Sequence, residues 1–351
     1  MHTITLTREN IANADNNSLV YNIPGSRNLE GCEIALSNLY MYYSWENINA
    51  SPLNNNIFYV KWPALQGGFG GIDIAITIPA GIYEVADLNA YLQQFSIDNN
   101  LYLENSTTGE YVYFIQMQVN ATRYSIQFNS FTLPIATTAG YTEPTGGFCN
   151  SPTLFGSGQQ TGVSYYAATT GDAPGFMFPA NFSSWAGFED GATFPVATGT
   201  GQFPTGNVSY LSTKAPQINP NPVIYLNCDK IMNTFANPQT FMYPIPAKVE
   251  IGALLQIEPP EYSFNKMMPG QFGTLRFSFT NANGQPIKII DPNIIITCVI
   301  RDHEDKSMNM GASNVGGISS SMETLRHSHK PVHGSVDSQH SNHMRRLHAH
   351  Y

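Results

Sequence analysis

The chain has 351 residues, of which only 12% are charged and 12% are aromatic, and its formal net charge is −9. This balance excludes a strongly basic nucleic-acid-binding face over the main body, and such sparse charge is typical of a surface covered by other subunits. No apolar stretch has the length of a signal peptide or a membrane span, so we expect synthesis in a reducing cytosol. The cysteines are far apart and lack metal-ligand spacing, which predicts reduced thiols: Cys32, Cys149, Cys228 and Cys298.

The first part of the chain predicts strands in quick succession. Runs rich in β-branched and aromatic residues alternate with Pro, Gly and Asn, as strands and their turns do. These runs are residues 2–7, 18–23, 32–45, 56–62 and 72–78.

One helix is expected among these strands. After a Pro/Gly turn at residues 79–81, the apolar residues change to a period near 3.6. Leu88, Tyr91, Leu92 and Phe95 then form one apolar stripe. We expect this stripe to face the core and the helix to cap an open end of a β-sandwich.

The composition changes after a predicted hairpin of residues 111–119 and 123–128. Residues 132–221 are rich in Gly, Pro, Thr, Ser and Phe, with few regular apolar runs. A segment of this kind predicts a large loop-rich insertion. We expect Trp185 and Phe188 to be exposed contacts of this insertion.

Regular strands return towards the C-terminal end, at residues 223–228, 248–258, 274–280, 286–290 and 293–301. Eight or more strands with one short helix predict an all-β protein with a single jelly-roll β-sandwich, a large insertion and a flexible C-terminal tail. The predicted parts are residues 1–131 and 222–302 for the two parts of the jelly roll, 132–221 for the insertion, and 303–351 for a His- and Ser-rich tail.

The sequence contains little that predicts catalysis. Before His303 the only histidine is His2, so the commonest general base is scarce, and no nucleophile motif is present. The Gly-rich residues 156–162 lack the spacing of a phosphate-binding loop. The tail histidines lack the further ligands of a metal site, and Arg345 with Arg346 is a weak signal for genome contact. We therefore expect no enzyme, no cofactor and no metal.

Three stretches carry a resemblance to a known family. They are LSNLYMYYSWENI (36–48), TIPAGIYEVADLNAYLQQF (77–95) and the terminal hairpin and strand at 273–301, supported by VIYLNCDKI (223–231). Together they resemble the penton, or minor capsid, proteins of virophages and polinton-like viruses. The resemblance implies a virion protein that is assembled in the cytoplasm of an infected host. It also implies a homopentamer at each icosahedral vertex, surrounded by trimers of a double jelly-roll major capsid protein.

The insertion and the tail match nothing in this family, and these parts and the N-terminal strand lead to hypotheses. The insertion is expected to project outwards and to contact a fibre or a host receptor. The tail and residues 2–7 are expected to contact the major capsid protein or the genome.

Three other classes of protein stay open from the residues alone. One is a receptor- or carbohydrate-binding jelly roll with Trp185 as a stacking platform, and another is a β-sandwich glycosidase that uses Glu189 and Asp190. The third is the major capsid subunit, for which the chain is short.

Overall fold

The computed structural model describes residues 1–156, 162–195 and 203–302, which belong to one compact unit. The predicted tail, residues 303–351, lies outside the described residues. Buried apolar side chains form two separate clusters within this unit. One cluster draws on residues 1–45 and 222–302, which we call the terminal lobe, and the other on residues 48–220, which we call the inserted lobe.

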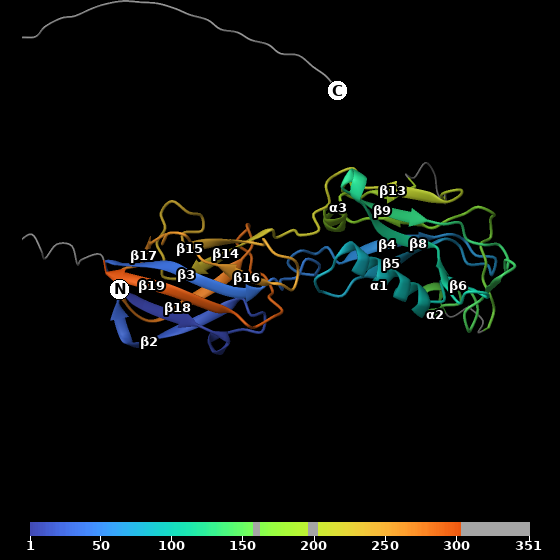
Figure 1. Cartoon of the computed structure of the whole chain (residues 1–351). Coiled ribbons are helices and arrows are strands. Elements are labelled where there is room, and N and C mark those ends of the chain that lie inside the picture. Colours follow the sequence, from blue (N-terminus) through green and yellow to red (C-terminus); the bar gives the residue numbers. More distant parts are fainter. Residues whose placement is uncertain (157–161, 196–202, 303–351) are drawn as a thin grey trace, which may run out of the picture. The chain divides into compact units, whose positions relative to one another are not determined.

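The terminal lobe consists of two antiparallel sheets (Figure 1). The first sheet contains, in spatial order, β1 (His2–Leu6), β19 (Ile295–Asp302), β3 (Cys32–Tyr42) and β16 (Leu254–Ile257), and β17 (Asn265–Lys266) also pairs with β3. The second sheet contains β15 (Phe241–Pro246), β14 (Val223–Cys228), β18 (Gln271–Thr280) and β2 (Ser18–Asn28).

This strand order is that of a jelly roll. Apart from the short β17, the chain visits the first and second sheets in the order first, second, first, second, second, first, second, first. Two Greek keys folded into two facing sheets produce this sequence of visits. The prediction of an all-β protein with a single jelly roll is therefore confirmed, and it applies to the terminal lobe.

Alternating side chains close the space between the two sheets. In β18, Leu275, Phe277 and Phe279 are buried, whereas Arg276 between them is exposed. A strand with one face on the core shows this period of two. The same pattern leaves the outer face of each sheet available to solvent or to a partner.

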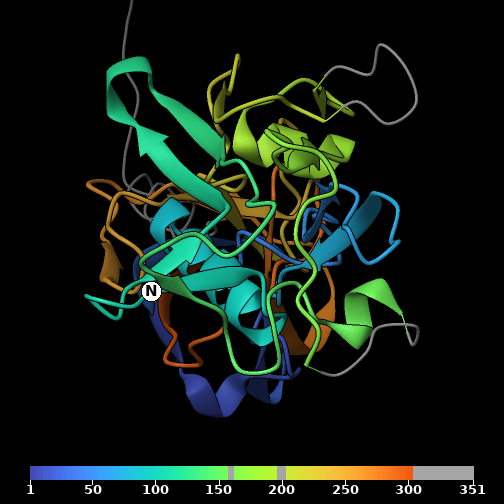
Figure 2. The ribbon, with the colours of Figure 1, turned by 90° about the vertical axis from the view of Figure 1, so that its right-hand side faces the viewer.

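The inserted lobe is built from shorter strands. One sheet has the order β12 (Thr193–Phe194), β11 (Gly175–Met177), β4 (Ile57–Trp62) and β5 (Ile72–Thr77), and another has β13 (Val208–Leu211), β9 (Ser125–Ser130) and β8 (Ile115–Asn120). A small third sheet contains β10 (Tyr141–Thr142), β6 (Tyr102–Asn105) and β7 (Tyr111–Tyr113). Figure 2 shows the β8–β9 hairpin protruding with its turn away from the neighbouring ribbons.

Five helical segments occur in the described residues. They are α1 (Val85–Asp98), α2 (Pro152–Phe155), α3 (Ala180–Ala186) and the 3-10 segments η1 (Arg8–Asn10) and η2 (Ala121–Arg123). Only α1 has the length of a typical helix. It begins where the Glu84 N–H donates to the Asp87 carboxylate at 2.8 Å, and Asn89 accepts a hydrogen bond from the Met117 N–H of β8 at 2.8 Å.

The predicted helix exists, but its place in the fold was predicted wrongly. Leu88 and Leu92 are buried, and Tyr91 and Phe95 are partly buried against the same cluster. That cluster is the core of the inserted lobe, so α1 packs there and does not cap the jelly roll.

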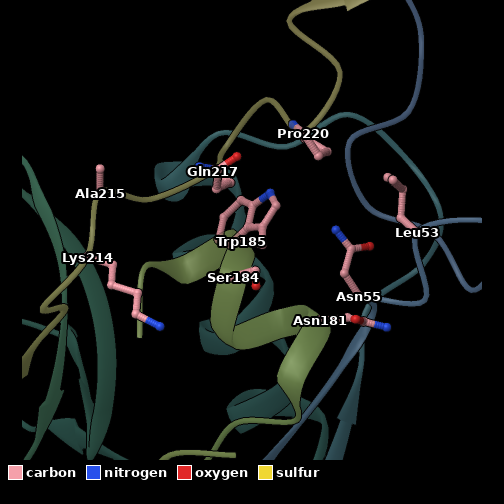
Figure 3. A pocket seen from close by; sticks show the side chains of 9 residues that line it. All are labelled: Leu53, Asn55, Asn181, Ser184, Trp185, Lys214, Ala215, Gln217 and Pro220. Atoms are coloured by element: carbon pink, nitrogen blue, oxygen red, sulfur yellow. The ribbon is translucent and has the colours of Figure 1, made fainter. Parts of the chain in front are cut away.

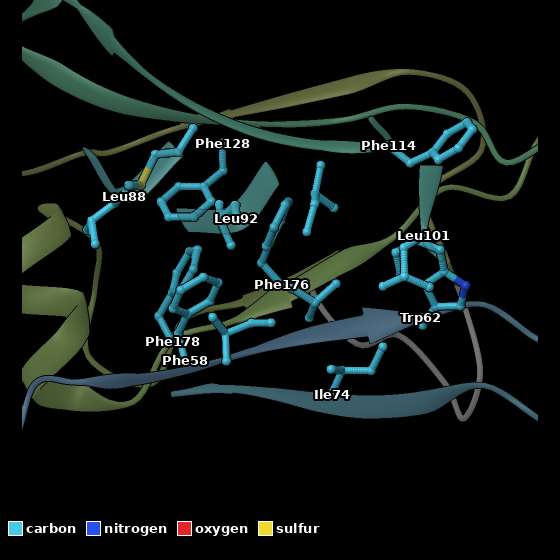
Figure 4. Close-up of a cluster of buried hydrophobic side chains, with 14 of the residues drawn as sticks. Phe58, Trp62, Ile74, Leu88, Leu92, Leu101, Phe114, Phe128, Phe176 and Phe178 are labelled. Atoms are coloured by element: carbon cyan, nitrogen blue, oxygen red, sulfur yellow. The ribbon is translucent and has the colours of Figure 1, made fainter. Parts of the chain in front are cut away.

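An aromatic cluster forms the centre of the inserted lobe (Figure 4). The Phe128 ring lies 4.7 Å from Phe178, 5.0 Å from Phe176 and 5.8 Å from Phe188, measured between ring centroids. Phe58 of β4 lies 5.9 Å from the same ring. Residues of the predicted insertion therefore share one core with residues that the sequence assigned to the jelly roll.

The boundary predicted at residues 131 and 132 does not separate the two cores. The excursion from the jelly roll begins after Trp45, between β3 and β14, and includes β4, β5 and α1. Local apolar patterns predict a strand but not the sheet that the strand joins, and β4 resembles a jelly-roll strand in composition. Residues 48–131 accordingly belong to the inserted lobe.

The two connections between the lobes lie beside each other. The Trp45 indole N–H donates to the carbonyl oxygen of Asn221 at 3.2 Å. The Asn47 amide donates to the carbonyl oxygens of Tyr83 at 2.7 Å and Ile218 at 2.9 Å. The bonds to Asn221 and Ile218 tie the outgoing segment to the returning one.

Candidate interaction surfaces

The outer face of the first sheet exposes a row of apolar side chains. Leu254 of β16 is opposite Tyr42 of β3, and Ile295 of β19 is opposite Tyr40. Leu254, Ile295 and Tyr42 are 49%, 42% and 37% exposed. We call this surface the knob face and define it by Tyr40, Tyr42, Leu254, Gln256 and Ile295.

The sequence predicted a different environment for part of this face. Residues 293–301 are apolar at nearly every position, which predicts a strand buried on both faces. The structure places β19 centrally between β1 and β3, but Ile295 points away from the core. An exposed isoleucine in a central strand indicates a surface that a partner can cover.

One carboxylate stands at the end of the knob face. Glu258 accepts a hydrogen bond from the Tyr40 hydroxyl at 2.8 Å and another from the Gln256 amide at 2.7 Å. These two hydrogen bonds lower the pKa of the Glu258 carboxyl, the bond from Tyr40 contributing most. Glu258 has no ion-pair partner within the described part of the chain.

The outer face of the second sheet carries a recess where the first sheet carries protruding side chains. Tyr225 and Phe241, with ring centroids 5.6 Å apart, line a pocket of about 250 Å³ together with Thr280 and the exposed Ala282. Arg276 lies on the same side of β18 as Thr280 and is exposed. We call this surface the pocket face and define it by Tyr225, Phe241, Arg276, Thr280 and Ala282.

Arg276 is the cation of the pocket face. Its backbone N–H is bonded to Asp229 at 2.9 Å, but its guanidinium makes no ion pair with any residue that the structure describes. Glu258 at the end of the knob face and Arg276 on the pocket face thus have opposite charges, and neither has an ionic partner among the described residues.

A third surface feature is a depression of about 470 Å³ beside α3 (Figure 3). Asn181, Ser184, Trp185, Lys214 and Gln217 line it, with other residues of the two connecting segments. Figure 3 shows Trp185 between Ser184 and Gln217. The indole ring belongs to the floor of the depression.

Trp185 and Phe188 are not the exposed contacts that the sequence suggested. Both are 1% exposed, and Phe188 lies 4.8 Å from the Phe178 ring. Trp185 packs against Phe182 at 5.8 Å between centroids. An aromatic-rich segment with few regular strands needs its rings for its own core, and this burial removes the stacking platform of a carbohydrate-binding site.

Glu189 and Asp190 are equally unsuited to glycosidase chemistry. Both residues are exposed, and the Glu189 carboxylate forms an ion pair with Lys214 at 2.7 Å. General acid catalysis by a carboxyl group requires burial that raises its pKa. The pair therefore lies at a solvated turn.

The other predicted sites give no chemical centre. All four cysteines are buried thiols, and burial raises the pKa of Cys228 to about 12. Within residues 1–156, 162–195 and 203–302, no group of three His, Cys, Asp or Glu residues could hold a metal ion, and no helix is long and apolar enough to cross a membrane. Most of the Gly-rich stretch 156–162 and all the tail histidines lie outside the described residues.

No protein-family model matches the sequence, and no curated protein matches it. Two solved structures are similar to the chain. The mavirus penton protein aligns at a TM-score of 0.37 and 8% identity, over 86% of this chain and 98% of that chain. A chain of the Sputnik virophage structure aligns at a TM-score of 0.34 and 10% identity, with the same two coverages. Because both TM-scores are below 0.5, the jelly roll is assigned above from the strand order of the chain itself.

Proposed function

We propose that this chain is a penton-type capsid subunit, which assembles as a homopentamer at the five-fold vertices of an icosahedral virion and contacts the major capsid protein. The observation that carries the proposal is the jelly-roll strand order of the terminal lobe. Viral capsid proteins are among the main users of this architecture. The sequence resemblance to virophage and polinton-like penton proteins supports the same function.

The surface of the terminal lobe suits a shell subunit. Exposed apolar side chains gather on the knob face, and the whole chain is poor in charge. Contiguous apolar patches on a soluble protein usually mark a contact with another protein. The edge strands β1 and β15 present unpaired backbone groups, which contacts within a shell would cover.

A structural role also agrees with the chemistry of the described residues. The acidic residues that the sequence offered for catalysis are solvated, and burial raises the pKa values of the Cys228 and Cys298 thiols. We therefore infer that the protein acts by assembly in the virion and not as an enzyme.

The inserted lobe is proposed to project outwards from the vertex. It is inserted at one place in the jelly roll, between β3 and β14, so it can extend beyond the sandwich without interrupting either sheet. A fibre or a host receptor is its proposed partner. The edge strand β1 and the tail are proposed to contact the major capsid protein or the genome.

The test is the mass and symmetry of the purified full chain. Native mass spectrometry should give five times 38.6 kDa, and negative-stain images should show five-fold rings. A chain that stays monomeric at every concentration, both alone and with the major capsid protein, would contradict the proposal. Deleting residues 48–220 with a short linker across the junction should spare the rings, whereas loss of rings would make the inserted lobe part of the shell.

A further inference from the structure

The knob face and the pocket face differ in a way that suits them to each other. The knob face presents protruding apolar side chains, of which Leu254 is the most exposed. The pocket face presents a recess of about 250 Å³ between two aromatic rings. Apolar side chains that fill such recesses supply most of the binding energy at protein interfaces.

The charges on the two faces are spaced alike. Glu258 follows Leu254 by four residues along the β16 edge, and Arg276 precedes Thr280 by four residues along β18. Four residues of strand span about 13 Å. A copy that places Leu254 in the pocket beside Thr280 can therefore place Glu258 at the distance of Arg276.

Charge also indicates which lobe makes the contact between copies. Residues 48–220 contain three basic residues against ten acidic residues, whereas the terminal lobe contains eight against ten. Two inserted lobes placed face to face would repel each other. The terminal lobe has a nearly balanced charge and carries Glu258 and Arg276, so it is the better surface for self-association.

We propose that neighbouring copies of this chain associate through unlike faces, with the knob face of one copy on the pocket face of the next. Leu254 and Tyr42 enter the recess beside Tyr225 and Phe241, and Glu258 pairs with Arg276. This inference rests on the proposed function, because it names the contact that closes the ring. A contact between unlike faces leaves one free knob face and one free pocket face at each step, and it ends only when a ring closes.

Two single substitutions test the two faces separately. Leu254→Arg places a charge on the knob face, and Ala282→Arg places a long side chain across the pocket. Both residues are exposed, so each variant should keep the melting temperature of the unaltered chain. Each variant should raise the apparent Kd of ring formation by about 100-fold or more, as expected for loss of a central contact. Tyr124→Arg, at a residue 76% exposed on the inserted lobe, is the control and should leave the rings intact.

Mixing the two variants gives the sharper result. The Ala282→Arg chain keeps an intact knob face, and the Leu254→Arg chain keeps an intact pocket face. The mixture should therefore form dimers of one chain of each kind and nothing larger, measured by native mass spectrometry. If the contact joins two like faces, only one variant loses rings and no mixed dimer forms, which overturns the proposal.

The charge pair has its own reversal test. Glu258→Arg and Arg276→Glu should each weaken ring formation about tenfold, and the double variant should recover most of the loss. If the unaltered chain and all these variants form rings equally well, this inference is overturned and the proposed function stands. Absence of rings in the unaltered chain, both alone and with the major capsid protein, would overturn the proposed function, and this inference with it.

Discussion

The terminal and inserted lobes both have a core between β-sheets, but different kinds of side chain fill the two cores. The buried cluster of the terminal lobe contains four aromatic residues among mostly aliphatic ones, whereas that of the inserted lobe contains thirteen. The terminal lobe has strands of up to eleven residues, and the inserted lobe has none longer than six. Long paired strands align many small side chains, but short strands joined by loops need rings that each cover about 150–250 Å².

The largest expected effect comes from a charge placed in one of the two cores, which tests whether the two lobes fold independently. Leu92→Asp puts a carboxylate into the inserted lobe and Leu255→Asp puts one into the terminal lobe, at residues that are both 1% exposed. Each should cost about 4 kcal/mol or more, enough to prevent its lobe from folding. Calorimetry with limited proteolysis should show which lobe is lost. Soluble, correctly assembled Leu92→Asp protein would contradict the assignment of α1 to a core.

A smaller change compares the packing of aromatic rings in the two lobes. Phe178→Ala and Phe277→Ala should each lower the free energy of unfolding by about 3–5 kcal/mol. Phe178 also loses ring contacts with Phe128 at 4.7 Å and Phe188 at 4.8 Å, so its loss should exceed that of Phe277 by about 1 kcal/mol. Urea denaturation measures both losses. Equal losses would mean that the aromatic cluster adds nothing beyond buried area.

Next in size is the effect of one ion pair from each lobe. Lys288 pairs at 2.7 Å with Glu46, whose side chain is 4% exposed, and Lys214 pairs at 2.7 Å with Glu189, whose side chain is 66% exposed. Lys288→Ala leaves a buried carboxylate with the Asn49 amide at 3.2 Å, and should cost about 1–2 kcal/mol. Lys214→Ala should cost less than about 0.5 kcal/mol, because its partner is solvated. Thermal unfolding of the two variants compares them directly, and equal costs would show that burial of Glu46 is unimportant.

A further comparison of the two lobes concerns alkaline pH. Burial raises the pKa of Tyr43 in the terminal lobe and of Tyr210 in the inserted lobe to about 12 in each case. The neutral phenol is the favoured form in the fold, so stability is complete below the ordinary value of 10 and is lost as the pH rises towards 12. Tyrosinate absorbance during an alkaline titration should report both groups. Normal titration near pH 10 in the folded protein would refute this.

Tyr210 also allows a substitution that should be almost silent. Its hydroxyl has no hydrogen-bond partner among the residues that the structure describes. Tyr210→Phe should therefore leave the free energy of unfolding within about 0.5 kcal/mol of the unaltered chain and remove one alkaline titration. A larger loss of stability would mean that this hydroxyl is bonded in solution.

The sequence predicts the class of the fold better than the pairing of its strands. Alternating β-branched and aromatic residues mark most strands and one 3.6-residue period marks α1, because both signals are local. The partners of β3 in the first sheet include β19, about 260 residues away. The sequence of neither segment indicates that the two strands pair. The division at residue 131 failed for this reason, since β4 carries the same local signal as a strand of the jelly roll.

The candidate surfaces were predicted least well, for a related reason. Apolarity alone gave Trp185 and Phe188 as surface contacts and residues 293–301 as a fully buried strand, yet the structure buries the first two and exposes Ile295. Whether an apolar side chain faces the core depends on the sheet beside it. A useful sequence signal was present at Leu254 and Leu255, because two adjacent leucines in one strand cannot both face the core.

The hydrogen bond from Trp45 to Asn221 bears on how the two lobes can evolve. It holds the outgoing and returning connections together. For the jelly roll, an excursion of more than 170 residues is therefore equivalent to a turn between β3 and β14. We expect that sequence within that excursion can be exchanged, shortened or replaced without changing the strand register of either terminal sheet. We therefore expect the terminal lobe and the inserted lobe to diverge at different rates within one gene.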